Sequence, residues 1–190
     1  MKKGKIIVIS APSGCGKSTI INAILDAGDI DMHFSVSATN RAPRTGEVDG
    51  VNYHFLTTEQ FQTAITEGRF IEWEEVYPGR YYGTLTDEVA NSINSGKNVI
   101  LDIDIKGALN VKQHFGDRAL TIFVLPPDID TLRRRLESRA TDSAVAIEQR
   151  VAKAEYEISF AGQCDVRIVN DDLDTAVADT RRAIIDFLDK

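Results

Sequence analysis

The chain has 190 residues, of which 43% are hydrophobic and 27% are charged, and its formal net charge is -7. This length and composition indicate one globular domain, and the acidic balance argues against a nucleic-acid polymer or an anionic membrane as the main partner. No stretch approaches the roughly 20 apolar residues of a membrane span, and the first residues carry no signal-peptide pattern. The chain has only two cysteines, and they have no metal-ligand spacing, which suggests a reducing compartment. We therefore expect a cytoplasmic protein.

The first predicted elements are a strand and a helix on either side of a glycine-containing loop. Residues 5–10 form a short β-branched run without alternation, which is typical of a parallel strand buried on both faces. Helical periodicity follows over residues 18–27 and stops at Gly28. The loop, residues 11–18 (APSGCGKS), nearly matches the phosphate-binding pattern G-x-x-x-x-G-K-[ST], with Ala11 in place of the first glycine. This context favours phosphate binding over a turn that binds nothing.

The loop has the chemistry that a nucleoside triphosphate requires. Glycines allow backbone N–H groups to form a concave anion site, and the helix N-terminus adds partial positive charge. Lys17 is expected to reach the β- and γ-phosphates, and the Ser18 hydroxyl to ligate Mg²⁺. Cys15 lies near the helix N-terminus, which lowers a thiol pKa, so a redox role stays open beside the passive role that we favour. The residues expected to hold the triphosphate are Ala11, Pro12, Ser13, Gly14, Cys15, Gly16, Lys17, Ser18 and Thr19.

The segment from residue 34 to residue 95 differs from the rest of the chain. Its short alternating stretches, glycines and aromatic residues predict a small mixed lobe inserted into a core made of residues 1–33 and 96–190. Within this lobe, Arg41 and Arg44 flank a proline and lie near several hydroxyl side chains. Two guanidinium groups with hydroxyl donors suit a phosphate dianion, although surface arginines beside a proline turn are common.

Strands and helices alternate through the remainder of the chain. This alternation predicts an α/β fold in which a mostly parallel sheet is covered by helices on both faces. The irregular stretch 138–143 separates two helices and is predicted to belong to a mobile lid at about residues 138–150. The predicted strands are 98–103, 120–125 and 165–169, and the predicted helices are about 106–114, 128–139, 144–161 and 173–188.

Several short motifs follow the phosphate loop and together cover nearly the whole chain. They are 37–41 (SATNR) with Arg44, 46–47 (GE), Tyr53, 70–73 (FIEW), 81–84 (YYGT), 101–104 (LDID) and 169–173 (VNDDL). In these motifs the chain resembles the guanylate kinases, a family of P-loop nucleoside monophosphate kinases. The resemblance implies a P-loop NTPase-type sheet with an inserted GMP-binding lobe and a helical lid. It also implies transfer of the γ-phosphoryl group of ATP to GMP and dGMP, with Mg²⁺, in purine nucleotide metabolism.

The resemblance assigns roles to individual lobe residues. It implies that the GMP phosphate is held by Arg41, Arg44, Tyr53 and Tyr82, that guanine is read by Ser37, Glu72 and Thr84 beside Gly83, and that Asn170 and Asp171 lie near the donor base. The guanine assignment also has independent chemical sense, because N1–H and the 2-amino group are two adjacent donors that one carboxylate accepts together. Adenine would leave a buried Glu72 unpaired. The alternative for Glu72 is a solvated charge in the acidic run 72–75.

Charged residues in the second half of the chain complete the expected site. Asp102 and Asp104 end a buried strand, where parallel-sheet proteins place ligands; the alternative is a solvated strand end. Asp102 is expected to act through the Mg²⁺ shell or a neighbouring arginine, and Asp104 nearer the acceptor nucleoside. We expect three arginines to close over the phosphates and to neutralise charge on the transferring group, and two others to form an ordinary basic helix surface. The first set is Arg135, Arg139 and Arg150, and the second is Arg133 and Arg134.

Two other kinds of protein fit parts of this pattern. One is a non-catalytic guanylate-kinase-like module that binds protein partners, and the intact Lys17 and Ser18 argue against it. The other is a P-loop kinase for a different monophosphate or small metabolite, against which Glu72 and the phosphate clamp argue. The histidines His33, His54 and His114 are expected to be structural or exposed. The sequence leaves the oligomeric state open.

Overall fold

The structure, a computed structural model, describes residues 3–138 and 143–190. Its core strands are β1 (Ile6–Ser10), β2 (Met32–Phe34), β7 (Asn98–Asp102), β8 (Ala119–Leu125) and β9 (Val166–Val169). The core helices are α1 (Lys17–Ala27), α3 (Thr86–Asn94), α4 (Ile105–Phe115), α5 (Ile129–Glu137), α6 (Ala144–Ile158) and α7 (Leu173–Leu188), with short 3₁₀ turns at Gly116–Arg118 and Ala161–Gln163. The lobe contains β3 (Ala38–Thr39), β4 (His54–Phe55), α2 (Thr58–Thr66), β5 (Phe70–Tyr77) and β6 (Arg80–Leu85).

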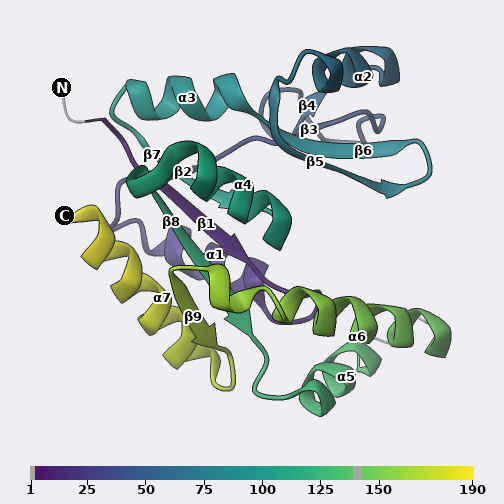
Figure 1. The fold of residues 1–190 in the computed structure, drawn as a ribbon, viewed down its shortest axis with the longest axis vertical. Helices are drawn as coiled ribbons and strands as arrows, with labels where there is room; N and C mark the ends of the chain where they lie inside the picture. Colours follow the sequence, from purple (N-terminus) through teal and green to yellow (C-terminus); the bar gives the residue numbers. More distant parts are fainter. Residues whose placement is uncertain (1–2, 139–142) are drawn as a thin grey trace.

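Two separate sheets organise the molecule. The core sheet has the order β2-β7-β1-β8-β9, and each neighbouring pair runs parallel. The lobe sheet has the order β4-β3-β6-β5 and is mixed. Figure 1 shows helices on both faces of the core sheet, and it shows the lobe and the α5–α6 pair at the same end of that sheet. The predicted α/β fold with a parallel sheet between helices is confirmed.

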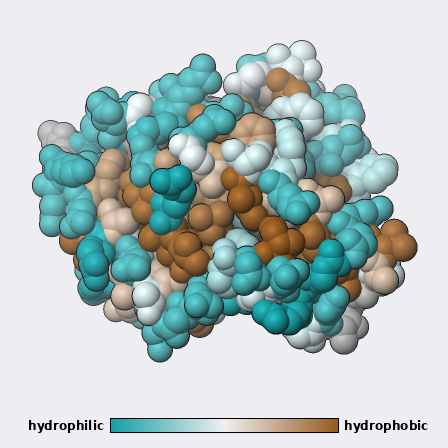
Figure 2. Space-filling view, turned by 60° about the horizontal axis from the view of Figure 1, so that its bottom comes forward, coloured by the Kyte–Doolittle hydropathy of each residue, from teal (hydrophilic) through white to brown (hydrophobic). Residues whose placement is uncertain are grey.

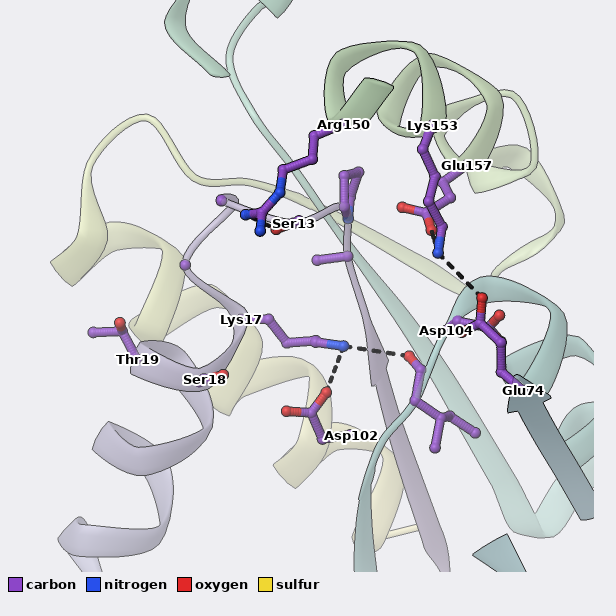
Figure 3. Close-up of a pocket in the computed structure, with 15 residues that line it drawn as sticks. Ser13, Lys17, Ser18, Thr19, Glu74, Asp102, Asp104, Arg150, Lys153 and Glu157 are labelled. Atoms are coloured by element: carbon purple, nitrogen blue, oxygen red, sulfur yellow. Dashed lines mark hydrogen bonds and ion pairs between the residues drawn. The ribbon is translucent and has the colours of Figure 1, made fainter. Parts of the chain in front are cut away.

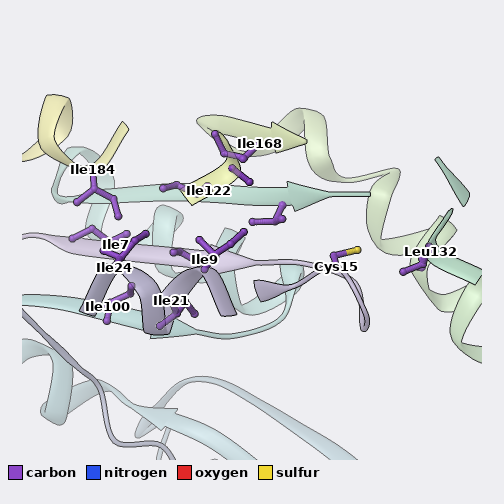
Figure 4. Close-up of a cluster of buried hydrophobic side chains, with 14 of the residues drawn as sticks. Ile7, Ile9, Cys15, Ile21, Ile24, Ile100, Ile122, Leu132, Ile168 and Ile184 are labelled. Atoms are coloured by element: carbon purple, nitrogen blue, oxygen red, sulfur yellow. The ribbon is translucent and has the colours of Figure 1, made fainter. Parts of the chain in front are cut away.

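The central strand β1 explains why the core forms. All five of its residues are buried, as expected for a strand covered on both faces. Ile7 and Ile9 pack in one hydrophobic cluster with α1 and α7, part of which is shown in Figure 4. Ile6 and Val8 pack in a second cluster with α3 and α4. Alternate side chains of one strand therefore hold both helical layers on the sheet.

Three elements differ from the sequence prediction. The edge strand β2 was not predicted, because its three residues are too few to show a pattern. Helix α3 was not predicted either, and its Val89 and Ile93 pack on the core sheet, although the expected lobe extends to residue 95. Helix α6 ends at Ile158 rather than near 161, since the chain turns there into a 3₁₀ segment.

The lobe is stabilised by local signals and by aromatic packing. Thr57 and Gln60 form a capping box at the start of α2. Phe61 of that helix stacks on Phe70 with ring centroids 4.4 Å apart and on Tyr81 at 5.5 Å. These contacts cover the outer face of the β5–β6 pair, so the alternate side chains of both strands are left to line the opposite face.

The surface shows where hydrophobic residues reach solvent. When the bottom of Figure 1 is brought forward, hydrophobic residues gather in the middle of the visible face and hydrophilic residues surround them (Figure 2). Val169 and Leu173, at the end of β9 and the start of α7, are among the exposed large hydrophobic residues. Within 3–138 and 143–190, no helix combines the length and apolar character needed to cross a bilayer.

Candidate active site

Two adjoining cavities lie between the phosphate loop and the lobe. The phosphate cavity, of about 480 Å³, is lined by residues 11–19 other than Cys15, and by Asp102, Ile103 and Arg150. The lobe cavity, of about 510 Å³, is lined by β5 and by the N-terminal part of α4. Both cavities share Glu74, Asp104, Lys153 and Glu157 as lining residues. The two spaces therefore adjoin at these four side chains and together make up the cleft between loop and lobe.

The phosphate loop is built to receive an anion. Gly14 and Gly16 have φ values of +93° and +83°, which L side chains rarely adopt, and these conformations turn the backbone around the cavity. Helix α1 begins at Lys17 with no side-chain cap on its N-cap residue and no acidic residue in its first turn. Its first N–H groups are therefore available to a bound anion.

Lys17 and Asp102 form an ion pair across the phosphate cavity (Figure 3). The Lys17 ammonium group also donates to the carbonyl oxygen of Ile103 at 3.5 Å. Asp102 ends β7, so the parallel pairing of β1 and β7 brings its carboxylate to the loop that follows β1. Ser18 lines the same cavity, and its hydroxyl and the Asp102 carboxylate are oxygen ligands of the kind that Mg²⁺ prefers.

Cys15 differs from its neighbours in the loop. Its side chain is fully buried in the core cluster between the loop and Leu132 (Figure 4), and burial raises the pKa of its thiol to about 12. The lowered thiol pKa that would support a redox role is therefore contradicted. The backbone of Cys15 has a polar partner, since its carbonyl oxygen accepts from the Asn170 amide at 2.8 Å.

The expected arginine set is divided between two places. Arg150 lines the phosphate cavity, and its guanidinium donates to the Ser13 hydroxyl at 3.4 Å. Arg135 instead donates to the carbonyl oxygen of Asn170 at 3.0 Å and lines a separate cavity of about 340 Å³. Arg135 therefore lies beside Gly14, Gly16 and Thr19 of the phosphate loop, on the Asn170 side, and its closure over the phosphates stays a prediction. Arg139 lies outside the described residues.

The Asn170 side of the loop forms this smaller cavity. Asn170 and Asp171 line it together with Gly14, Gly16 and Thr19. The two residues thus lie beside the phosphate loop, where the resemblance expects the donor base. The arginines assigned to the helix surface have local partners: Arg133 pairs with Glu148, and Arg134 donates to the Thr131 hydroxyl at 2.8 Å.

A carboxylate faces the lobe cavity from β5. Glu72 is opposite Thr84 of β6, and the Thr84 hydroxyl donates to Glu72 Oε1 at 2.6 Å. Burial raises the pKa of Glu72 to about 7, and the nearby Asp104 carboxylate adds to the increase. The β3–β6 register pairs Ala38 with Gly83, and its continuation brings Ser37 alongside Thr84. Expected guanine-reading residues therefore meet on one face of the lobe sheet.

Asp104 joins this face from the core. It is the N-cap of α4, and its side chain accepts from the Gly107 N–H at 2.7 Å. It lines both cavities. This cap fixes the carboxylate at the base of the cleft, between Lys17 and Glu72.

The expected phosphate clamp is occupied by a carboxylate of the chain itself. The Arg41 guanidinium donates twice to Glu47 at 2.8 Å, and the backbone N–H of Arg44 donates to the same carboxylate at 2.6 Å. Hydrogen bonds from Arg41 lower the pKa of Glu47 to about 2. The Cζ atom of Arg41 lies 5.3 Å from the centroid of the Tyr53 ring, and the centroids of the Tyr53 and Tyr82 rings are 5.8 Å apart. The structure thus brings Arg41, Tyr53 and Tyr82 together.

Arg44 lies beside this group rather than within it. It lines a shallow pocket with Arg41 and the β5–β6 turn. The histidines are engaged away from the phosphate cavity: His33 hydrogen-bonds to the Ser92 hydroxyl at 3.2 Å, His54 lies 3.7 Å from Glu88, and His114 packs against Phe115.

Sequence reasoning missed several residues that line the cleft, Glu74 of β5 among them. Lys153 and Glu157 were overlooked, although their spacing of three and seven residues from Arg150 is a signal that they share one face of α6. Gly107 was also overlooked. A Cβ atom at this position would lie 2.7 Å from Glu72 Cγ, so the glycine allows Glu72 to approach α4.

Comparisons with known proteins agree with this geometry. A family model described as "Guanylate kinase" matches residues 3–186. The chain is 52% identical over 186 residues to a guanylate kinase from Porphyromonas gingivalis, covering 98% of this chain and 99% of the relative. It is 51% identical over 188 residues to one from Salinibacter ruber, covering 99% of each. The crystal structure of guanylate kinase from Anaplasma phagocytophilum matches with a TM-score of 0.75 at 29% identity, covering 100% of this chain and 89% of the other. The chain therefore belongs to the guanylate kinase family.

Proposed function

We propose that this chain is a nucleoside monophosphate kinase that transfers the γ-phosphoryl group of ATP to GMP, giving ADP and GDP. The observation that carries the proposal is the position of two groups in one cleft. The Lys17–Asp102 pair lies at the phosphate loop, and the Glu72–Thr84 pair lies on the lobe face beyond Asp104. A donor triphosphate and an acceptor base can therefore occupy the cleft end to end.

The acceptor base is recognised by its donor pattern. In its ionised form Glu72 accepts hydrogen bonds from guanine N1–H and the 2-amino group together. The Thr84 hydroxyl holds the carboxylate in place, and the β3–β6 register brings Ser37 alongside Thr84. Adenine presents no such donor pair, so it would leave the Glu72 carboxylate desolvated and unpaired. The same chemistry admits dGMP, because the base is unchanged.

The acceptor phosphate is held by Arg41, Arg44, Tyr53 and Tyr82. Glu47 orients the Arg41 guanidinium through two hydrogen bonds. A phosphate dianion has the same paired-oxygen geometry as this carboxylate and can replace it. Glu47 thus keeps the Arg41 guanidinium beside the Tyr53 ring, where the phosphate is expected.

The donor phosphates are held by the loop backbone and Lys17. Ser18 and Asp102 would hold Mg²⁺, which when bound neutralises charge on the β- and γ-phosphate oxygens. Arg150 reaches the loop from α6 at the end of the proposed lid, residues 138–150, and adds positive charge there. Because the acceptor phosphate attacks directly, no side chain has to act as a general base. Reaction rate then depends on positioning and electrostatic stabilisation.

Both substrates are nucleotides of the cell interior, and we place the enzyme in the cytoplasm. The two cysteines support this placement, since both are free thiols.

A coupled assay that compares GMP, dGMP, AMP, UMP and CMP with ATP and Mg²⁺ tests the function. We expect kcat/KM to be highest for GMP, with dGMP second, and lower by about 10⁴-fold or more for AMP. No ADP production with GMP would indicate a module that binds protein partners instead. A preference for another monophosphate would overturn the role of Glu72.

Gly107→Ala is expected to raise the KM for GMP by about tenfold and to leave the KM for ATP unchanged. The added methyl group would meet the Glu72 side chain at 2.7 Å and displace its carboxylate from the guanine position. Steady-state kinetics with each substrate varied in turn measure the effect. Gly162→Ala is the matched control, because nothing lies within 4 Å of a Cβ atom there. A Gly107→Ala enzyme with wild-type KM for GMP would contradict the proposed position of Glu72.

A further inference from the structure

Helix α6 presents three charged side chains to the cleft. Arg150, Lys153 and Glu157 follow one another at intervals of three and four residues, which places them on one helix face. Figure 3 shows all three pointing from α6 toward the phosphate loop and the lobe strand β5. The first of them contacts the loop through the Ser13 hydroxyl.

Lys153 connects this helix to the lobe. Its ammonium nitrogen lies 3.2 Å from Glu74 Oε1 of β5 and 3.8 Å from Glu157 Oε1. Glu157 is only 8% exposed, so its carboxylate is a fixed partner on the same helix. Of the four described residues that line both cavities, Lys153 is basic, and the other three, Glu74, Asp104 and Glu157, are acidic. The ammonium group is thus held by acidic neighbours where the two halves of the cleft meet.

The lobe partner of Lys153 belongs to the acceptor face. Glu74 lies two residues after Glu72 on β5, so both side chains are on the same face of the strand. Its cross-strand partner is Tyr82, one of the residues assigned to the acceptor phosphate. The ion pair therefore begins beside the acceptor site, and it ends on the helix that carries Arg150 to the donor site.

We propose that Lys153 is a positioning residue for phosphoryl transfer. Through its ion pair with Glu74, it fixes the position of the acceptor lobe relative to the face of α6 that carries Arg150. This proposal rests on the proposed kinase function. Both partners of the pair are substantially exposed, with side-chain exposures of 58% and 42%, so the pair adds little to folding stability. Its effect is on alignment, because small errors in the relative position of two reacting groups lower the rate strongly.

Removing either charge should lower the rate of transfer by a similar factor. We expect Lys153→Met and Glu74→Gln each to lower kcat for GMP phosphorylation about tenfold, and the double variant to lower it about tenfold as well. Lys153→Arg, which retains the charge and most of the length, should stay within about twofold of wild type. The dissociation constant of ATP should change by less than about twofold in every variant, because the donor loop is intact.

The controls separate alignment from a purely structural role. Glu148→Gln also removes an ion pair from α6, with Arg133, and should keep wild-type kcat. Thermal unfolding midpoints should match that of wild type. A double variant whose kcat falls about a hundredfold, or a Lys153→Met enzyme with wild-type kcat, would overturn this proposal. If the wild-type chain phosphorylates GMP in the same assay, the kinase function is unaffected by that result. A wild-type chain that does not phosphorylate GMP would instead overturn the kinase function itself.

Discussion

Lys17→Ala is expected to lower kcat for phosphoryl transfer from ATP to GMP by about a thousandfold. The Lys17 ammonium group is the charge that the loop offers to the β- and γ-phosphates. Its loss would also leave the Asp102 carboxylate without its ion-pair partner beside the donor phosphates. Both effects raise the energy of the transition state, in which negative charge spreads over the transferring group.

The measurement is kcat at saturating ATP and GMP, together with the dissociation constant of GMP by calorimetry. GMP affinity should be unchanged, because the acceptor residues lie on the lobe face and not at Lys17. Lys112→Ala is the matched control. Lys112 forms a comparable ion pair with Asp165, with 2.9 Å between Nζ and Oδ1, and neither residue lines the phosphate cavity or the lobe cavity. If Lys17→Ala raised the KM for ATP while kcat stayed at the wild-type value, Lys17 would contribute to ground-state binding alone.

The core could be predicted from sequence because its signals are local. The buried strands β1, β7 and β8 are continuous apolar runs, and a helix follows each of them. The short edge strand β2 has no such run, and its place is set by pairing with β7. Helix α3 follows the lobe in sequence but packs on the core, and only tertiary contacts decide which layer a helix joins.

The site could be predicted where residue type and spacing are sufficient. The phosphate loop is one continuous segment, and its strand and helix neighbours confirm its context. The contact of Glu47 with Arg41 depends on how one irregular loop turns back on itself, and the contact of Lys153 with Glu74 depends on how two segments 79 residues apart in the sequence meet. Arg135 shows the same limit, since its position on α5 gives no sign that it reaches Asn170.

Glu72→Gln is expected to lower kcat/KM for GMP by about a hundredfold, which corresponds to about 3 kcal/mol of lost hydrogen bonding to a charged acceptor. A glutamine side chain has one acceptor oxygen and presents an NH₂ donor where guanine also donates, so one of the two guanine donors is left unpaired. The ratio of kcat/KM for GMP over AMP should fall by a similar factor. Glu67→Gln, which removes an exposed lobe carboxylate, should leave both values unchanged.

The pH dependence provides the sharper test of the same residue. Burial raises the pKa of Glu72 from 4.5 to about 7, so near neutral pH the protonated form competes with the ionised form that guanine requires. The KM for GMP should therefore fall as pH rises from about 6 to about 8. The GMP phosphate also titrates in this range, since phosphomonoesters have a second pKa of about 6, and Glu72→Gln removes only the part of the dependence that belongs to the carboxyl group.

Stability should change with pH in the opposite sense. Because the folded chain holds a proton on Glu72 that the unfolded chain releases, the free energy of unfolding should fall as pH rises from 4.5 to about 7. Denaturant titrations of wild type and Glu72→Gln at several pH values in this range measure the difference. The wild-type chain should lose stability relative to the variant across the interval, while its affinity for GMP increases. The free energy of unfolding could instead vary with pH in the same way in wild type and Glu72→Gln, and the pH profile of KM for GMP could be the same in both. These results together would show that Glu72 is ionised throughout and that its desolvation is not the source of guanine selectivity.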